Sequence, residues 1–459
     1  MQRLKTQLYK GNRLTASKGL IGEGSRLKNG IWPRSVALWM AAFYVALFVI
    51  RPWEELFPWL GIIHFERIYA ICMIIAVLFT KKKSFQITFQ TFAVIIFLCG
   101  IGLAGFFSID PSLSWEPFYE YCSLVVFYFI LILVIRDSYE LIFVIICYVT
   151  AMGVYLVKAQ WEFWIHGQHL YDMGVVRLIG IESTYGSPNS LSMSIVVSLP
   201  LALFLWSYRN EITLRWPKLW QKLFLNFLAL YSLLTVSSVI LTNSRSGMLS
   251  FVLFVILSAS SGGRVRKKFT YILVGAFILG MIWSLMPEEN KGRFKTIWDK
   301  EAGPKTATIS ARGRIEGFNA GLKMFERFPL TGVGIGNFIS YRVAHLDGIA
   351  LSAHNLVGQV LGETGAIGGI TFLLLVSTIL VNCRRLRALS KIRSDGKLRT
   401  LSSLGIAFRN SLFLLIFEGL FGHNLFRFNW LWLAAFSSLA VQYARHHVKN
   451  NLGTNIPGG

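Results

Sequence analysis

Charged side chains are scarce in this chain: Asp, Glu, Lys and Arg make up 15% of its 459 residues. A typical soluble domain is about 25% charged. Because 54% of the chain is also hydrophobic, an ordinary soluble domain is excluded. The apolar residues form runs longer than the ~18 residues that predict a membrane-spanning helix. The strands of a membrane barrel are ~10 residues of alternating hydrophobicity, so that class is excluded too and a polytopic helical membrane protein is indicated.

Cysteine is scarce as well, and its pattern excludes two kinds of site. No two cysteines are spaced as CxxC, so we expect neither a disulfide nor a zinc site. The sequence also has no DxD pair that could hold a metal-bound nucleotide, and we expect no metal and no cofactor. The five cysteines lie in or beside apolar runs or, for the last, next to a basic segment: Cys72, Cys99, Cys122, Cys147 and Cys383.

Acidic residues are outnumbered by basic ones, with 23 Asp and Glu against 46 Lys and Arg and a net charge of +23. In a soluble protein this charge would suggest binding to nucleic acid. Here most basic residues flank apolar runs, as in loops that stay on the inner side of a membrane, so we expect membrane lipids and no nucleic acid as partners. Hydropathy predicts an all-α integral membrane fold of about 12 transmembrane helices, at 36–50, 61–80, 89–107, 122–135, 139–157, 189–207, 223–241, 247–261, 269–286, 356–382, 401–418 and 427–444.

The basic N-terminus predicts the orientation of the spans. Residues 1–34 are rich in Lys and Arg but lack the apolar core of a cleaved signal, so we expect a disordered cytoplasmic tail there. A polytopic membrane domain would follow at 35–445, and 446–459 would form a second cytoplasmic tail. The largest outer segment, 287–353, separates spans nine and ten. Outer segments of this length are where we expect functional residues.

Two arginines lie at the predicted outer ends of spans. Arg245 follows Thr242-Asn243-Ser244 in a short polar turn, where it can bind an anion at the membrane surface. The alternative is a snorkelling residue that only marks topology, but such residues favour the inner face. Arg177 precedes the segment 186–189, whose proline is also an ordinary helix-start signal, so both a ligand role and a structural role stay open for it.

Two further arginines, Arg312 and Arg314, precede an amphipathic pattern of helical spacing. Guanidinium groups before such a helix can form an anion site, although a solvated helix face explains the same pattern. The segment PLTGVGIGNF follows at 329–338, with glycine at alternate positions that permit close backbone approach or a tight bend.

His354 and Asn355 open the tenth predicted span from the outer side. A histidine near water titrates close to neutral pH and suits general acid or base catalysis, while the alternative is an interfacial residue that caps a helix. Glu363 follows deeper in the span, and an intramembrane carboxylate indicates function or a polar network. Several arginines and one histidine on one face fit a substrate whose phosphates are bound by guanidinium groups.

These pieces together resemble the O-antigen ligase and O-antigen polymerase superfamily. The resemblance rests on Arg245, on Arg314 with its helix and PLTGVGIGNF, and on His354-Asn355 with the Glu363-Thr364-Gly365 segment. It covers about residues 190 to 380, whereas the N-terminal third is similar in hydropathy alone.

The resemblance implies a helical fold of the C type of glycosyltransferases in a bacterial inner membrane, with both termini cytoplasmic and the active site at the periplasmic face. The donor would be a polyprenyl-diphosphate-linked glycan and the acceptor a glycan or glycolipid, joined by a metal-independent, inverting transfer. The resemblance implies that His354 is the base and that Arg245 and Arg314 bind the diphosphate. Arg312 is a close competitor of Arg314 for this role, and Arg177 is a further candidate. Asn355 and Glu363 would support the site.

Two alternatives stay open. A polymerase uses the same donor chemistry as a ligase and differs only in its acceptor. A transporter of a lipid-linked or small anionic solute belongs to another class. Transporters place ionisable residues near the membrane midplane, for which Arg409 and Glu363 are the candidates.

Overall fold

The computed structural model describes residues 33, 35–54, 56–80, 87–172, 175–180, 185–261, 265–285, 288–295, 305–392 and 395–453. The expected tail at 1–34 therefore lies outside the described residues apart from Pro33. At the other end, the last helix runs on to Gly453. No helix end marks the expected boundary between 445 and 446.

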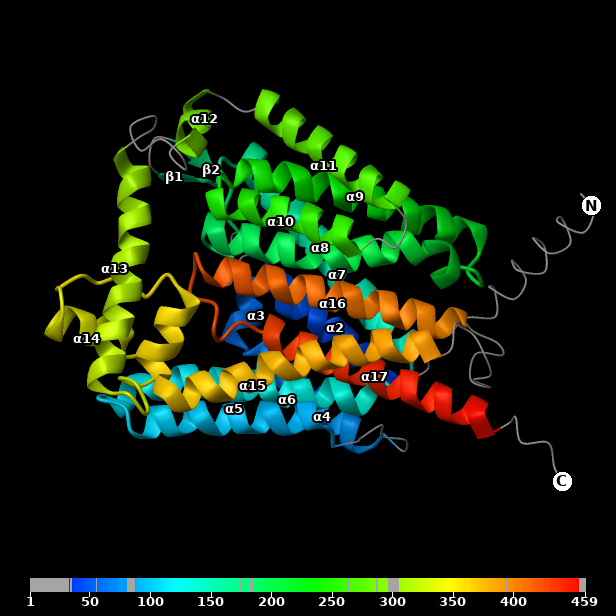
Figure 1. Cartoon of the computed structure of the whole chain (residues 1–459), viewed down its shortest axis with the longest axis horizontal. Coiled ribbons are helices and arrows are strands. Elements are labelled where there is room, and N and C mark those ends of the chain that lie inside the picture. Colours follow the sequence, from blue (N-terminus) through cyan, green and yellow to red (C-terminus); the bar gives the residue numbers. More distant parts are fainter. Residues whose placement is uncertain are drawn as a thin grey trace, which may run out of the picture.

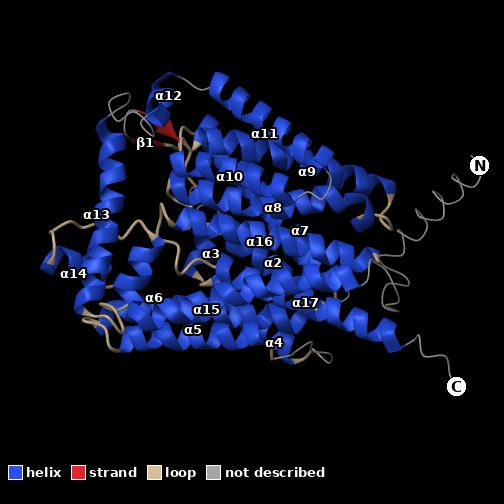
Figure 2. Cartoon of the chain, in the orientation of Figure 1, coloured by secondary structure: helices blue, strands red, loops and turns tan. Residues whose placement is uncertain are grey.

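The described chain is almost entirely helical, and most of its long helices lie side by side along the long axis of the molecule, while Lys305–Arg327 runs across them (Figures 1 and 2). Two short strands pair antiparallel, with Leu170 opposite Arg177. The elements are α2 (Val36–Ile50), α3 (Pro58–Ile62), α4 (Phe65–Leu78), α5 (Phe89–Phe106), α6 (Pro111–Val134), α7 (Ser138–Ile165), β1 (Leu170–Asp172), β2 (Val175–Arg177), α8 (Pro188–Ile212), α9 (Lys218–Leu241), α10 (Arg245–Ser261), α11 (Val265–Leu285), α12 (Glu288–Lys295), α13 (Lys305–Arg327), α14 (Phe338–His345), α15 (Leu356–Ile392), α16 (Gly396–Gly419) and α17 (Asn429–Gly453).

The predicted all-α membrane architecture is confirmed, while the count of twelve spans is not. Among the described residues, seven helices are long and apolar enough to cross a membrane, namely α5, α6, α7, α8, α9, α15 and α16. Each predicted range overlaps a helix, but some of these helices are short. At ~1.5 Å per residue, the 14 residues of α4 reach about 21 Å, less than the ~30 Å of a hydrocarbon core. The seven helices suggest a multi-pass membrane protein.

Local signals explain where several helices begin. Ser187 precedes α8, and its hydroxyl accepts a hydrogen bond from the backbone N–H of Ser190 at 3.1 Å. Pro188 occupies the first helical position, where its missing N–H is not needed. Asp110 and Pro111 begin α6 in the same way. The start of α8 therefore follows from the residues at 187–188 alone.

The segment 287–353, which we expected on the outer side, contains helices α12, α13 and α14 rather than one irregular loop. Glycines let α13 pack directly against the first half of α15. A Cβ on Gly321 would lie 2.3 Å from the carbonyl oxygen of Gly358, and one on Gly362 would lie 3.1 Å from the Cα of Gly321. Contacts this short exist only between backbones without side chains. The glycines thus bring α13 against the helix that His354 precedes.

The glycine-rich segment 329–338 completes the hydrogen bonds of a break in α15. The break is at Gly365, with φ 60° and ψ −157°, a backbone conformation that glycine tolerates. The carbonyls of Gly362 and Glu363 accept hydrogen bonds from the N–H groups of Val333 and Gly334, at 2.8 and 3.1 Å. The N–H groups of Ala366 and Ile367 bond in turn to the carbonyls of Pro329 and Leu330, at 2.8 and 3.1 Å. The break therefore leaves none of these four groups without a partner.

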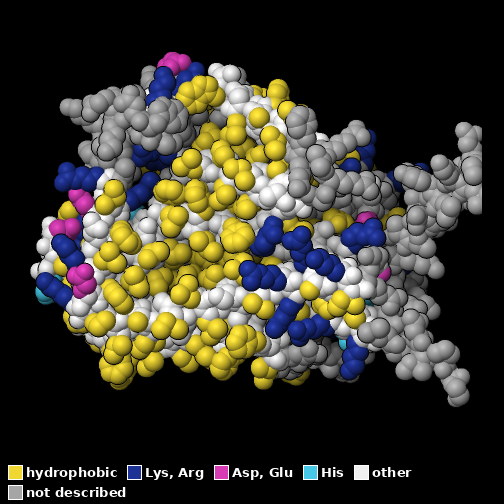
Figure 3. All heavy atoms as spheres, viewed as in Figure 1, with side chains coloured by type: hydrophobic (Ala, Val, Ile, Leu, Met, Phe, Trp, Pro, Cys, Tyr) yellow, Lys and Arg dark blue, Asp and Glu magenta, His cyan; other side chains and the backbone are white. Residues whose placement is uncertain are grey.

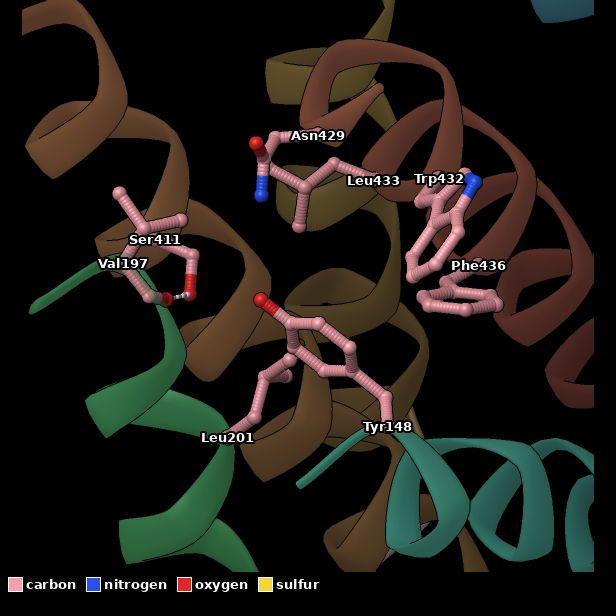
Figure 4. Close-up of a pocket in the computed structure, with 8 residues that line it drawn as sticks. All are labelled: Tyr148, Val197, Leu201, Ser411, Asn429, Trp432, Leu433 and Phe436. Carbon is pink, nitrogen blue, oxygen red and sulfur yellow. Dashed lines mark hydrogen bonds between the residues drawn. The ribbon is translucent and has the colours of Figure 1, made fainter. Parts of the chain in front are cut away.

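Between α7, α8, α16 and α17 the bundle encloses a small cavity (Figure 4). Its volume is about 20 Å³, which is room for about one water molecule. Tyr148, Asn429 and Trp432 line it together with Ser411, whose hydroxyl donates to the carbonyl of Val197 at 2.8 Å. A sugar or a lipid chain does not fit there, so a substrate site must lie elsewhere.

Candidate active site

Arg245 is the first residue of α10, and a buried polar turn presents it. Asn243 in that turn has a left-handed backbone with φ 46°. The hydroxyl of Ser244 accepts from the N–H of Gly247 at 3.2 Å and donates to Asn189 at 2.8 Å. Because Ser244 is almost fully buried, the turn is fixed against α8. Arg245 itself is half-buried at the edge of this fixed turn.

Arg177, at the end of β2, is bonded to the same turn. Only 4% of its surface is exposed. Its Nε donates to the carbonyl of Thr242 at 3.0 Å, and its guanidinium also donates to Asn189 at 3.2 Å. The backbone N–H of Leu178 adds a bond to the carbonyl of Leu241 at 2.8 Å. Arg177 thus packs against the turn that carries Arg245.

The two neighbouring arginines of α13 differ in their surroundings. Arg312 has 79% of its side chain exposed and forms an ion pair with Glu316, one turn further along the helix, at 2.7 Å. Arg314 is half-buried, and its guanidinium lies over the ring of Phe421 at 5.8 Å from the centroid. The positive charge of Arg314 is also close enough to His354 to lower the pKa of its imidazole. The structure therefore brings Arg314 to the histidine and leaves Arg312 on the surface.

His354 lies in the turn that leads into α15, with a left-handed backbone at φ 45°. Asn355 caps the helix: its side-chain oxygen accepts from the N–H groups of Val357 and Gly358, at 2.9 and 3.1 Å. Its side-chain amide donates to the carbonyl of Leu420 at 3.1 Å. The capping predicted as an alternative for His354 thus falls to Asn355. This frees the imidazole of His354 from that role.

The surroundings of His354 favour its neutral form. Desolvation lowers the pKa of the imidazole below its usual 6.5, and the positive charges of Arg314 and then Arg342 lower it further. A histidine with a lowered pKa is unprotonated at neutral pH, so it can accept a proton. The neutral imidazole is the form that a general base requires.

Arg342 is a residue of this site that sequence reasoning missed. Its guanidinium is fully buried and donates three hydrogen bonds to the carboxylate of Asp347, at 2.9, 3.1 and 2.8 Å. It also donates to the carbonyl of Leu351 at 3.2 Å. Arg342 thereby fixes the loop that runs into His354. It lies in the eight-residue helix α14, whose sequence gives no sign that one arginine is buried.

His423, also missed, lies in the connection between α16 and α17. Its ring centroid is 5.3 Å from that of His354, and its Nδ1 is 3.2 Å from the hydroxyl of Ser352. The pKa of His423 is lowered through desolvation and through the nearby His354 and Arg427. Leu420 and His423 thus bring this connection against the loop of His354. A sequence separation of 69 residues left no local pattern that could have joined the two histidines.

The buried carboxylates of Glu418 and Glu363 lie in different places. Glu418 of α16 has Ser246 and Ser250 of α10 beside it, within reach of the charge of Arg314. Glu363 lies instead at the break in α15, where the side-chain amide of Gln359 donates to it at 3.2 Å. Glu418 thus lies near the start of α10 and near Arg314, and Glu363 belongs to the packing of the glycine-rich segment.

A family model described as O-antigen ligase matches residues 227–373. The match runs from within α9 to within α15, so it includes Arg245, Arg314 and His354 but neither Arg177 nor His423. No curated protein matches the chain. The matched family implies glycan transfer of the ligase or polymerase type, with lipid-linked glycans as substrates. Over residues 227–373, the chain is therefore similar to the O-antigen ligase family.

Proposed function

We propose that this protein transfers a glycan from a polyprenyl-diphosphate carrier to a sugar hydroxyl of a glycan or glycolipid acceptor. The reaction takes place at the periplasmic face of a bacterial inner membrane, with both termini in the cytoplasm. Arg245 and Arg314 bind the diphosphate, and His354 is the general base. The apolar surface holds the polyprenyl chain, and the segment 287–353 covers the glycan.

The observation that carries this proposal is a half-buried His354 whose pKa is lowered by desolvation and by the nearby charge of Arg314. In the reaction the hydroxyl of the acceptor loses its proton to the imidazole as its oxygen attacks the anomeric carbon. The bond from that carbon to the diphosphate breaks, and the electron pair leaves with the diphosphate. Guanidinium groups held in place neutralise the charge that develops there. A single displacement inverts the anomeric configuration and uses no metal ion.

The remaining candidates have supporting roles in this mechanism. The hydrogen bonds of Arg177 to Thr242 and Asn189 hold the turn of Arg245, so its contribution to diphosphate binding acts through that turn. Asn355 holds the first turn of α15 against Leu420. Glu363 maintains the break in α15. Arg312 forms an ion pair on the surface, which favours Arg314 as the diphosphate ligand.

Replacement of the base tests the proposal directly. General-base catalysis contributes typically ~10²–10⁴-fold to a rate, so His354→Ala should lose at least a hundredfold in glycan transfer. The loss should persist with donor and acceptor both saturating, because the histidine acts after binding. A folded His354→Ala protein that transfers glycan at nearly the wild-type rate would contradict the assignment.

Ligase and polymerase activity are distinguished by the acceptor. Incubation of the purified protein with lipid-linked donor alone lengthens the glycan on its carrier if the protein is a polymerase. Transfer only after addition of a separate glycolipid identifies a ligase. Neither product forms in detergent, where there is no second compartment, if the protein is a transporter.

A further inference from the structure

Arg409 is a charged residue in the middle of a membrane helix, far from the site of His354. It lies thirteen residues after the first residue of α16, which is about 20 Å along the helix at ~1.5 Å per residue. Its guanidinium donates to the hydroxyl of Ser261, the last residue of α10, at 2.6 Å and to the side chain of Asn410 at 3.0 Å. The side chain is half-buried. Arg409 is thus fixed where α10 ends, at the opposite end of that helix from Arg245.

More positive charge faces Arg409 from α15. Gly405 lets the two helices approach closely, since a Cβ there would lie 2.8 Å from the side chain of Leu386. One residue further on, Arg387 is near enough for its charge to act on Arg409. Arg384 lies one helical turn before Arg387, and both side chains are exposed.

Within the part of the chain that the structure describes, no acidic side chain forms an ion pair with Arg384, Arg387 or Arg409. Like charges held together repel one another, and the repulsion is strongest for a group partly removed from water. An anion that bound between the guanidinium groups would remove this repulsion.

The surroundings indicate that this anion belongs to a lipid. Phe413, one turn beyond Arg409 toward the other end of α16, and Ile256 of α10 are both exposed apolar side chains. Figure 3 shows Lys and Arg side chains gathered where the apolar surface over α15 and α16 ends. A flexible arginine that merely marks topology would lie in a loop or at a helix end. Arg409 instead lies inside a helix and is held by hydrogen bonds.

We propose that Arg384, Arg387 and Arg409 bind the phosphate of an anionic phospholipid in the leaflet opposite to the active site. The lipid tails lie against the apolar surface next to Phe413, and the headgroup bridges α15, α16 and the end of α10. This site is independent of glycan transfer. Its occupancy stabilises the packing of α10 against α16.

Lipid binding to the purified full-length protein tests this site. In native mass spectrometry and in thermal unfolding, phosphatidylglycerol should bind and raise the melting temperature, and phosphatidylcholine should do so much less. Loss of one charge-assisted contact weakens binding about tenfold, so Arg387→Gln should bind phosphatidylglycerol about tenfold more weakly. Because Arg387 is exposed, this variant should fold normally. Arg409→Lys keeps the charge in the helix and serves as a second variant.

Arg445→Gln is the matched control, because it removes an exposed positive charge from α17. Equal binding of phosphatidylglycerol by the wild type and Arg387→Gln would overturn the proposal. So would an equal loss in Arg445→Gln, because the lipid would then respond to overall charge. If inorganic phosphate stabilised the protein as much as the lipid does, the site would bind free phosphate and the assignment to a lipid would be wrong.

Discussion

The contact of Gly317 with the loop of His354 gives a sharp test of the active-site geometry. Gly317 lies on α13, three residues after Arg314. A Cβ added to it would be 2.3 Å from the carbonyl oxygen of Ala353 and 3.2 Å from that of Ser352. Both atoms are backbone, so no side chain can rotate away. Gly317→Ala therefore has to move α13 and the loop of His354 apart.

The size of the movement follows from the contact distance. Real Cβ atoms approach an oxygen no closer than about 3 Å, so the two segments must separate by about 1 Å, and a misplacement of this size can lower a rate about 10²-fold. Overpacking destabilises a protein by about 1–3 kcal/mol, and the better helix propensity of alanine offsets about 1 kcal/mol of this. We expect a folded protein with a transfer rate about a hundredfold lower.

The measurement is glycan transfer by purified Gly317→Ala with donor and acceptor saturating, alongside its melting temperature. Gly280→Ala on α11 is the matched control, because a Cβ there meets no atom within 4 Å. The control should keep wild-type activity. If Gly317→Ala also transferred at the wild-type rate, α13 would not contact the loop of His354 in the active protein, and the proposed pairing of Arg314 with His354 would be wrong.

Three further predictions concern the charges and orientation of the site. Arg314→Lys should reduce transfer by an amount equivalent to about 2–4 kcal/mol of transition-state stabilisation, whereas Arg312→Lys should be nearly silent in the same assay. The reverse result would exchange their roles. Wild-type activity should fall as pH drops through the lowered pKa of His354, which gives the pH–rate profile an acid limb. Arg342→Met should move this limb to higher pH, and Arg342→Lys should keep it at the wild-type position. If Arg342→Met left the acid limb at the wild-type pH, the charge of Arg342 would not lower the pKa of His354. Ala350→Cys should react with a membrane-impermeant maleimide from the periplasmic side, and reaction only from the cytoplasmic side would refute the proposed orientation.

The helices of the membrane domain could be predicted because hydropathy is a local property. Each predicted range overlaps a helix, and the pattern after Arg314 predicted the amphipathic helix observed as α13. The number of spans could not be predicted equally well. A short apolar run such as that of α4 reads like a span, although its helix is too short to cross a membrane unaided.

The assembly of the site depends on contacts that no local pattern encodes. The glycines at 329–338 were recognised as unusual, but their role depends on a helix break at Gly365 that only the folded chain brings beside them. His423 and Arg342 are ordinary residues in their own segments. They act on His354 because the connection between α16 and α17 and the loop after α14 converge there. The positions of His423 and Arg342 in the site therefore depend on long-range packing and could not be predicted from the sequence.

Backbone strain connects the two turns of the proposed active site. Among the described residues, four other than glycine have positive φ, and two of them are Asn243 and His354. A left-handed backbone is unfavourable by roughly 1–2 kcal/mol for most residues with a side chain and less so for asparagine, and such strain persists only where surrounding contacts fix it. Arg177 and Ser244 fix the first turn, and the bond of Arg342 to Leu351 fixes the loop before the second. Because hydrogen bonds of the buried side chains of Arg177, Ser244 and Arg342 hold both turns, Arg245 and His354 are held in place before a substrate binds. Transition-state stabilisation by fixed groups requires this arrangement.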